Sequence, residues 1–144
     1  MYLNHRAHTL WDSKNGGRVV EVNHTPYKEK ELYEMISTAL RKRLDEKYVI
    51  SRETNVLYSL IVNEKLEIEP SNYKEPSRGE FSFQVDLLVG ESLGDNKVLP
   101  LVIIEIKKGP ITTHDVITYS TKAQMHKKVY PYLRYGLLIF GEET

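Results

Sequence analysis

The segment LPLVIIEIKKG, residues 99–109, constrains the fold more than any other stretch of the chain. Aliphatic residues fill most of it, as in a strand that is buried on both faces. Glu105 and Lys107 interrupt this apolar run, and because strand side chains alternate, both emerge on the same face of the sheet. Either the two charges neutralise each other there, or a ligand outside the chain requires them.

Strand-like and helix-like runs alternate along the rest of the chain. Two strand-like runs flank Asn15-Gly16-Gly17, a turn that tolerates positive φ, and together they predict an N-terminal β-hairpin. An apolar stripe predicts a first helix from Pro26 to Glu46 with Thr25 as its N-cap. Strands are predicted over residues 48–53, 81–90, 99–109 and 135–141, a loop over 69–80, and a second helix over 113–129 begun by Thr112 or Thr113, whereas the apolar run 55–63 fits either a helix or a strand.

The order of these elements predicts an α/β fold. A helix that crosses between two apolar strands requires at least one parallel pair, and such a sheet carries helices on its faces. With 144 residues the chain is long enough to bury the core of one domain. We therefore expect a single domain over residues 1–144, with residues 1–25 as a hairpin extension and residues 26–141 as the core.

The composition excludes several classes of function. Lys and Arg together number 20, as do Asp and Glu, and this zero net charge argues against a protein held on DNA by charge alone. The absence of cysteine excludes disulfides, thiolate chemistry and cysteine zinc sites. No leader-like segment and no apolar run of membrane length stands in the sequence, so a cytoplasmic protein without a membrane partner is expected. Phosphate-binding loops, nucleophile elbows and dinucleotide fingerprints are also missing from the sequence.

A second acid is expected beside Glu105. Asp86 lies on the predicted strand 81–90, and a short turn joins that strand to the one that carries Glu105. If the two strands are neighbours, their buried carboxylates repel each other unless a cation intervenes. Mg²⁺ takes oxygen ligands, so Asp86, Glu105 and the backbone carbonyl of Ile106 predict a site for Mg²⁺, with Mn²⁺ as a substitute. Lys107 reaches the same pocket to orient a water or a phosphate oxygen, which completes the parts for metal-assisted phosphodiester hydrolysis.

These residues resemble the signature of the PD-(D/E)xK nuclease superfamily. Asp86 is followed by eighteen residues and then by Glu105-Ile106-Lys107 on an apolar strand, although Gln84-Val85 precedes Asp86 where many members have a proline. The superfamily includes restriction endonucleases, Holliday-junction resolvases and DNA-repair nucleases, and its core runs helix, three strands, helix, strand. The resemblance implies a restriction-endonuclease-like core over residues 26–141, a mixed sheet flanked by helices, and nuclease activity.

Many members of that superfamily also carry a glutamate on the first helix, and four stand in or beside the predicted one. With Leu32 at 0°, the apolar stripe spans about 120° of the helix and Glu29 falls at roughly 60°, in its middle. Glu31 is the second choice, because a shifted helix start changes the count. A solvated acid favoured by the helix dipole is the alternative for Glu29. The two remaining candidates are Glu34 and Glu46.

The predicted second helix follows the strand of Glu105 directly and carries further polar candidates. His114 and Asp115 at its start either approach the substrate backbone or cap the helix. Tyr119 and Lys122 either contact phosphates or belong to a solvated face. Tyr119 is also what some branches of the superfamily carry on this helix, with a glutamine where Asp115 stands here.

The sequence therefore predicts a Mg²⁺-dependent DNA endonuclease, either restriction-like or structure-specific. Its catalytic residues are Asp86, Glu105, Lys107 and Glu29, of which all but Lys107 serve the metal. Because cutting both strands requires two sites, we expect a homodimer. The alternatives are a catalytically inactive domain of the same fold that binds nucleic acid or protein, with Glu105 and Lys107 as a buried ion pair, and a nuclease that acts on RNA.

Overall fold

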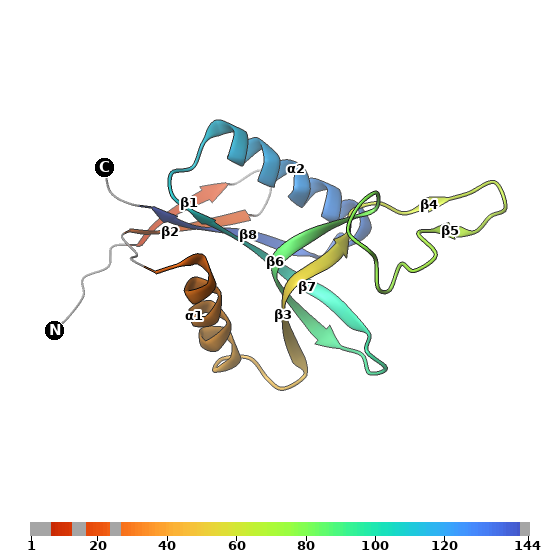
Figure 1. Ribbon diagram of the computed structural model, residues 1–144, viewed down its shortest axis with the longest axis horizontal. Helices are drawn as coiled ribbons and strands as arrows, with labels where there is room; N and C mark the ends of the chain where they lie inside the picture. The colour runs from red at the N-terminus through yellow and green to blue at the C-terminus, as the bar shows by residue number, and fades with distance from the viewer. Residues whose placement is uncertain (1–6, 13–16, 24–26, 142–144) are drawn as a thin grey trace.

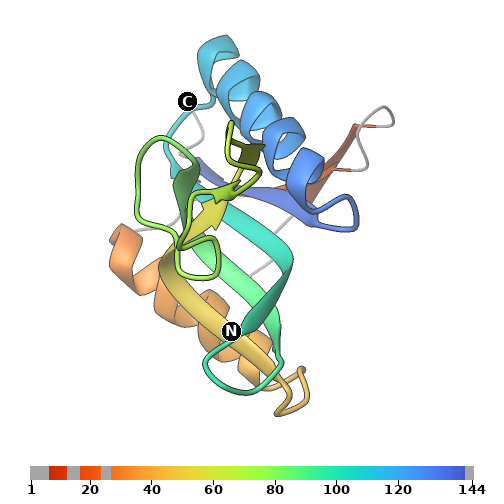
Figure 2. The same cartoon turned by 90° about the vertical axis from the view of Figure 1, so that its right-hand side faces the viewer.

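A computed structural model shows a twisted sheet with one long helix on each face (Figures 1 and 2). The structure describes residues 7–12, 17–23 and 27–141. Among these residues, no helix is long and apolar enough to cross a membrane.

The sheet has six strands and mixed direction. In spatial order they are β1 (Ala7–Asp12), β2 (Gly17–Asn23), β8 (Arg134–Gly141), β7 (Val98–Lys108), β6 (Ser82–Ser92) and β3 (Tyr48–Leu57). The helix α2 (Thr113–Val129) connects β7 to β8, and these two strands are parallel. β2 also runs parallel to β8, whereas the remaining neighbours are antiparallel. The predicted α/β class, the parallel pair and the bounds of the second helix are confirmed.

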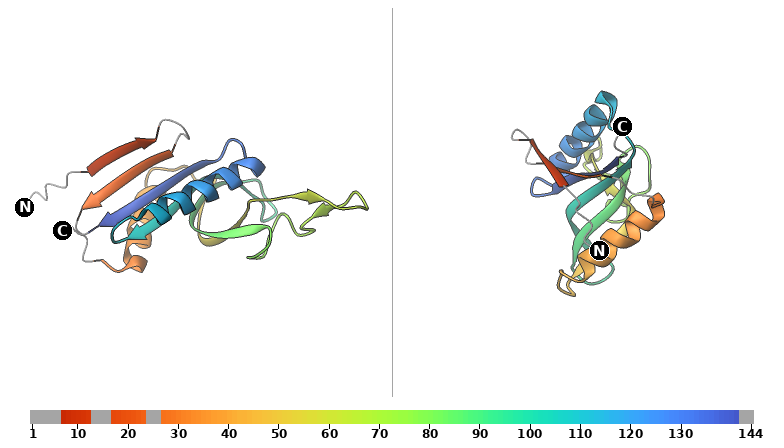
Figure 3. Two further views of the ribbon diagram at one scale, coloured as in Figure 1. Left: turned by 90° about the horizontal axis from the view of Figure 1, so that it is seen from above. Right: turned by 90° about the vertical axis from the view of Figure 1, so that its left-hand side faces the viewer.

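The N-terminal hairpin is part of this sheet. β1 and β2 pair antiparallel, as the sequence predicts, although residues 13–16 of the connecting turn lie outside the described residues. β2 then pairs with β8, so the hairpin extends the main sheet by two strands. Figure 3 shows it at one end of the molecule.

The first helix, α1 (Glu29–Arg41), is shorter than predicted at both ends. The expected N-cap Thr25 and Pro26 lie outside the described residues, and Lys28 occupies the N-cap position, where its backbone N–H donates to the Glu31 carboxylate at 2.7 Å. At the other end the Arg43 N–H donates to the Leu40 carbonyl at 3.0 Å. This tighter bond between residues three apart ends the helix before Glu46.

Each helix covers its own apolar cluster. On the α1 side, Leu32 and Tyr33 pack against a group from the sheet that consists of Ile50, Leu87, Val89 and Ile106. On the other side, Ala123 of α2 packs against Val56, Val85, Leu88, Ile103, Leu133 and Tyr135. The central strands are therefore buried on both faces, which explains their continuous apolar sequences.

The alternation of side chains breaks in the middle of β6. Val85 and Leu87 are two residues apart, yet they face opposite sides of the sheet. The register of β3 against β6 places Glu53 opposite Asp86, and Glu53 has a φ of 48°, which is rare for a residue with a side chain. A backbone distortion therefore lies next to Asp86, where the sheet changes which way its side chains point.

The segment that the sequence left ambiguous contains both a strand and a projecting arm. β3 runs through residues 48–57 as one strand, longer than the predicted 48–53. β4 (Ile61–Val62) and β5 (Ile68–Glu69) then pair antiparallel in a sheet of their own. This arm extends away from the body of the molecule (Figures 1 and 3).

Candidate active site

Asp86 and Glu105 lie where two neighbouring strands separate. The ladder between β6 and β7 pairs Leu87 with Ile104 and does not continue beyond them, so Asp86 and Glu105 are the next residues outward. The Ile106 N–H donates to Asp86 Oδ2 at 2.7 Å, and the Asp86 N–H donates to Glu105 Oε2 at 3.3 Å. Each carboxylate thus reaches across to the backbone of the other strand, and the two lie side by side as the strand order predicts.

The backbone N–H of Ile106 also points towards the Asp86 carboxylate. In a strand, the N–H and C=O of one residue point to the same side. Because the Ile106 N–H points at the Asp86 carboxylate, its carbonyl is directed to the β6 side as well. Its side chain packs in the α1 cluster, so this residue is firmly anchored. Two carboxylates and one carbonyl therefore converge at the fork between β6 and β7.

Glu105 is almost fully buried, with 2% of its surface exposed. Its Oε1 accepts a hydrogen bond from the Tyr135 hydroxyl at 2.7 Å and lies 3.5 Å from the Lys122 ammonium. Burial raises the pKa of Glu105 above its usual range, and Asp86 adds to this, although Lys122 and Tyr135 act in the opposite direction. The site thus holds a carboxylate in surroundings that penalise its charge.

Lys107 is paired with the second helix and not with Glu105. Its ammonium lies 3.1 Å from Asp115 Oδ1. Asp115 also accepts hydrogen bonds from Thr112, and these, together with Lys107, lower the pKa of Asp115 to about 2. Asp115, which is also part of the N-terminal cap of α2, therefore holds the Lys107 side chain at the start of that helix. The cap prediction for Asp115 and Thr112 is confirmed.

Glu29 sits at the rim of this cluster. It is the first residue of α1 and is exposed, which corrects the expectation of an acid in the middle of the buried face. The Tyr33 hydroxyl donates to Glu29 Oε1 at 3.4 Å. Burial raises the pKa of Tyr33, and the neighbouring Asp86 and Glu29 carboxylates raise it further. Tyr33 therefore lies between Glu29 and Asp86, whereas Glu31 is occupied at the helix cap.

The donor set is chemically suited to a hard divalent cation. Carboxylate and carbonyl oxygens are the ligands that Mg²⁺ and Mn²⁺ prefer. Across the described ranges of the chain, no three Asp, Glu or His side chains gather closely enough to form a metal-binding group on their own. The candidate set is therefore the pair of Asp86 and Glu105 with the Ile106 carbonyl, and Glu29 stands apart from it.

Two tyrosines belong to the site that the sequence analysis did not single out. Tyr135 lies opposite Ile103 in the β7–β8 ladder and binds Glu105 from there. Tyr33 follows Glu29 by four residues and so shares its row on α1. Spacing on the helix would have found Tyr33, but Tyr135 depends on the parallel register of β7 and β8. Lys122, expected at phosphates or on a solvated face, contacts Glu105.

Comparison with known proteins gave no family. No family model matches the chain, and no curated protein or solved structure matches it either. The residues of this site and their geometry are therefore the basis for assigning a function.

Proposed function

We propose that the protein is a metal-dependent endonuclease that hydrolyses phosphodiester bonds in DNA. The observation that carries this proposal is the juxtaposition of Asp86 with the buried Glu105 at the fork of β6 and β7, with Lys107 two residues further on the same strand. The order α1, β3, β6, β7, α2, β8 supports the resemblance to the restriction-endonuclease-like core. The arm and the N-terminal hairpin are additions to that order.

Asp86, Glu105 and the Ile106 carbonyl would hold Mg²⁺, or Mn²⁺ in its place. When bound, such a cation would polarise a phosphate oxygen and make a neighbouring water molecule more acidic. Tyr135 fixes the orientation of Glu105 through its 2.7 Å hydrogen bond. A preorganised carboxylate of this kind needs no rearrangement when a cation or substrate arrives.

Lys107 orients the attacking water in this proposal. Its side chain lies on the same face as that of Glu105 and is 31% exposed, so a water and a phosphate have access to it. The pair with Asp115 positions Lys107 in the absence of substrate. Tyr119 of α2 also borders the site, because the centre of its ring lies 5.6 Å from Lys122 Nζ. Burial first, and then Glu105 and Asp86, raise the pKa of Tyr119 to about 12. Glu29 acts through Tyr33 at the rim of the cation site.

One observation favours a second candidate, an inactive domain of the same fold that binds nucleic acid or protein. Glu105 is paired with Lys122, and Lys107 is paired with Asp115. These two pairs neutralise Glu105 and Lys107 without a metal. An inactive domain would need no cation in addition to these two pairs, whereas the nuclease would. The two candidates therefore differ in their response to divalent cations.

The test is cleavage of supercoiled plasmid and of a branched DNA junction, with Mg²⁺ or Mn²⁺ against EDTA. We expect cutting only with metal, and a loss on the order of 100-fold or more in Asp86→Asn and in Lys107→Met. Lys97→Met is the matched control, because Lys97 is an exposed lysine in the turn between β6 and β7. RNA substrates of the same length show whether cleavage requires deoxyribose.

The unfolding temperature of each variant is measured alongside, so that a lost activity is not a lost fold. Full cutting by Asp86→Asn would exclude the proposed metal site. If neither metal supports cutting of DNA or RNA, the inactive binding domain is the better account.

A further inference from the structure

The β4–β5 arm displays apolar side chains that the fold leaves in water. Ile61 is 47% exposed, Val62 65%, Leu66 85% and Ile68 51%. Among the residues that the structure describes, the two strands of the arm pair only with each other. Large apolar residues gathered on one small projection are typical of a contact surface.

The fold of the chain does not favour a leucine at position 66, at the tip of the arm. The φ of Leu66 is 60°, a left-handed conformation in which a bulky side chain is a clear outlier and in which glycine or asparagine is favoured. Most of its side chain is in solvent, so it gains little from burial within the chain. Neither the local backbone nor the core explains a leucine here, which points to a contact outside the chain.

The charge of the arm narrows the choice of partner. Three carboxylates, Glu64, Glu67 and Glu69, stand against the one ammonium of Lys65. Asn63 donates hydrogen bonds to Glu67 and Glu69, but within the described residues none of these acids forms an ion pair. An acidic arm is repelled by the phosphates of DNA. It fits a surface that is apolar and basic.

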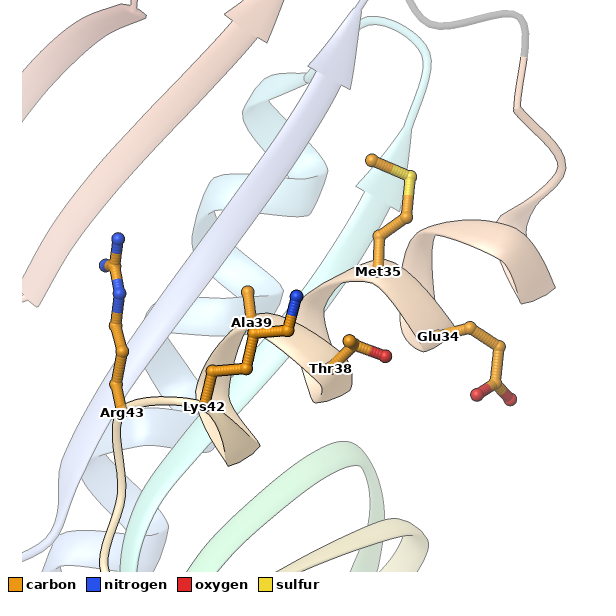
Figure 4. Close-up of a pocket in the computed structure, with 6 residues that line it drawn as sticks. All are labelled: Glu34, Met35, Thr38, Ala39, Lys42 and Arg43. Carbon is orange, nitrogen blue, oxygen red and sulfur yellow. The ribbon is translucent and has the colours of Figure 1, made fainter.

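The outer face of α1 has these two properties. A hollow of about 510 Å³ there is lined by Glu34, Met35, Thr38, Ala39, Lys42 and Arg43. Figure 4 shows Met35 on α1, and Lys42 and Arg43 just beyond its last residue, extending upward, whereas Glu34 points down. Glu34 is paired with Arg52, whereas Lys42 and Arg43 form no ion pair within the part of the chain that the structure describes.

We propose that the arm of one chain docks in the α1 hollow of a second copy, and that the contact is reciprocal. The arm is at one end of the long axis and α1 lies in the other half of the molecule (Figures 1 and 3). Two copies in antiparallel orientation about a two-fold axis therefore bring each arm to the other copy's hollow. Apolar arm residues cover Met35 and Ala39, and arm carboxylates approach Lys42 and Arg43. This dimer does not depend on the nuclease proposal.

The first test separates binding from folding. Analytical ultracentrifugation over a concentration series should give a dimer for the wild type and a dissociation constant raised about tenfold or more for Leu66→Asn, because symmetry repeats the change in two contacts. Asparagine tolerates the left-handed backbone, so at protein concentrations low enough for the wild type to be monomeric, the variant and the wild type should have the same unfolding temperature. Ile117→Asn is the control, since Ile117 is 60% exposed on α2 and outside both surfaces.

The second test is an exchange of charges. Glu67→Lys and Arg43→Glu each place like charges in both contacts of a homodimer, and each variant should be mainly monomeric. An equimolar mixture of the two should form a heterodimer, in which one contact is wild type and the other pairs Lys at position 67 with Glu at position 43. A monomeric wild type overturns the proposal. So does a dimer that persists in both charge variants, or a mixture of the two that remains monomeric.

Discussion

At the scale of the single residue, burial of the Glu105 carboxylate costs folding free energy. Glu105 is a buried carboxylate whose pKa is raised chiefly by burial, with the neighbouring Asp86 as a further cause. A group whose folded pKa lies above its unfolded value stabilises the fold at low pH, and this contribution is lost as the pH rises through the folded pKa. At neutral pH and without metal, Glu105 therefore works against stability, as functional residues often do.

Glu105→Gln should make the metal-free protein more stable at pH 8, by about 1 kcal/mol. Glutamine can keep the Tyr135 hydrogen bond while removing the buried charge. The difference between variant and wild type should shrink towards pH 5, where the wild-type carboxyl takes up its proton more readily. Denaturant unfolding in EDTA at both pH values measures it. A variant that is less stable at pH 8 than the wild type would show that Lys122 and Tyr135 already compensate the charge.

At the scale of the element, α2 is held to the sheet by a buried histidine. His126 is fully buried, and its Nδ1 lies 2.9 Å from the Leu57 carbonyl of β3, so Nδ1 carries the proton and donates. Its Nε2 is buried and has no hydrogen-bond partner among the described residues. Burial lowers the pKa of His126, which the Leu57 carbonyl opposes and Lys122 reinforces. The neutral ring therefore belongs to the folded state.

Acid should loosen this contact. Because the folded pKa of His126 lies below the unfolded value near 6.5, its contribution to stability is complete above that value and is lost as the pH falls through the folded pKa. The unfolding temperature of the wild type should thus drop more steeply between pH 7 and pH 5 than that of His126→Asn, in which the amide can replace the Nδ1 donor. Parallel slopes for the two proteins would assign the acid sensitivity to other groups.

The elements differ in how far the sequence determines them. α2 could be predicted to the residue because Thr112 and Asp115 cap its start and Pro131 follows its end. α1 was predicted too long, since Leu44 continues the apolar stripe and packs on the core after the backbone has left the helix. The sequence divides β3 into two segments, because Glu53, which has a positive φ, interrupts the alternation of side chains along the strand. Periodicity follows burial, and burial does not end where a helix or strand ends.

At the scale of the whole molecule, it is easier to predict from the sequence which residues lie near each other than which hydrogen bonds and ion pairs they form. Asp86 and Glu105 could be placed side by side because the chain connects their strands by a short turn. The partners Lys122 and Tyr135 come from α2 and β8, and their contacts depend on how the helix crosses the sheet. The expectation that Lys107 and Glu105 form a pair of their own, which the inactive alternative included, is wrong for the same reason.

The central claim is that Asp86 and Glu105 form a site for a divalent cation, and direct titration with Mn²⁺ tests it without any choice of substrate. Isothermal calorimetry should show saturable binding to the wild type, accompanied by a rise in unfolding temperature. Asp86→Asn should lose both effects, and Lys97→Met should keep them. Equal binding by the wild type and Asp86→Asn, or no binding by either, would contradict the account.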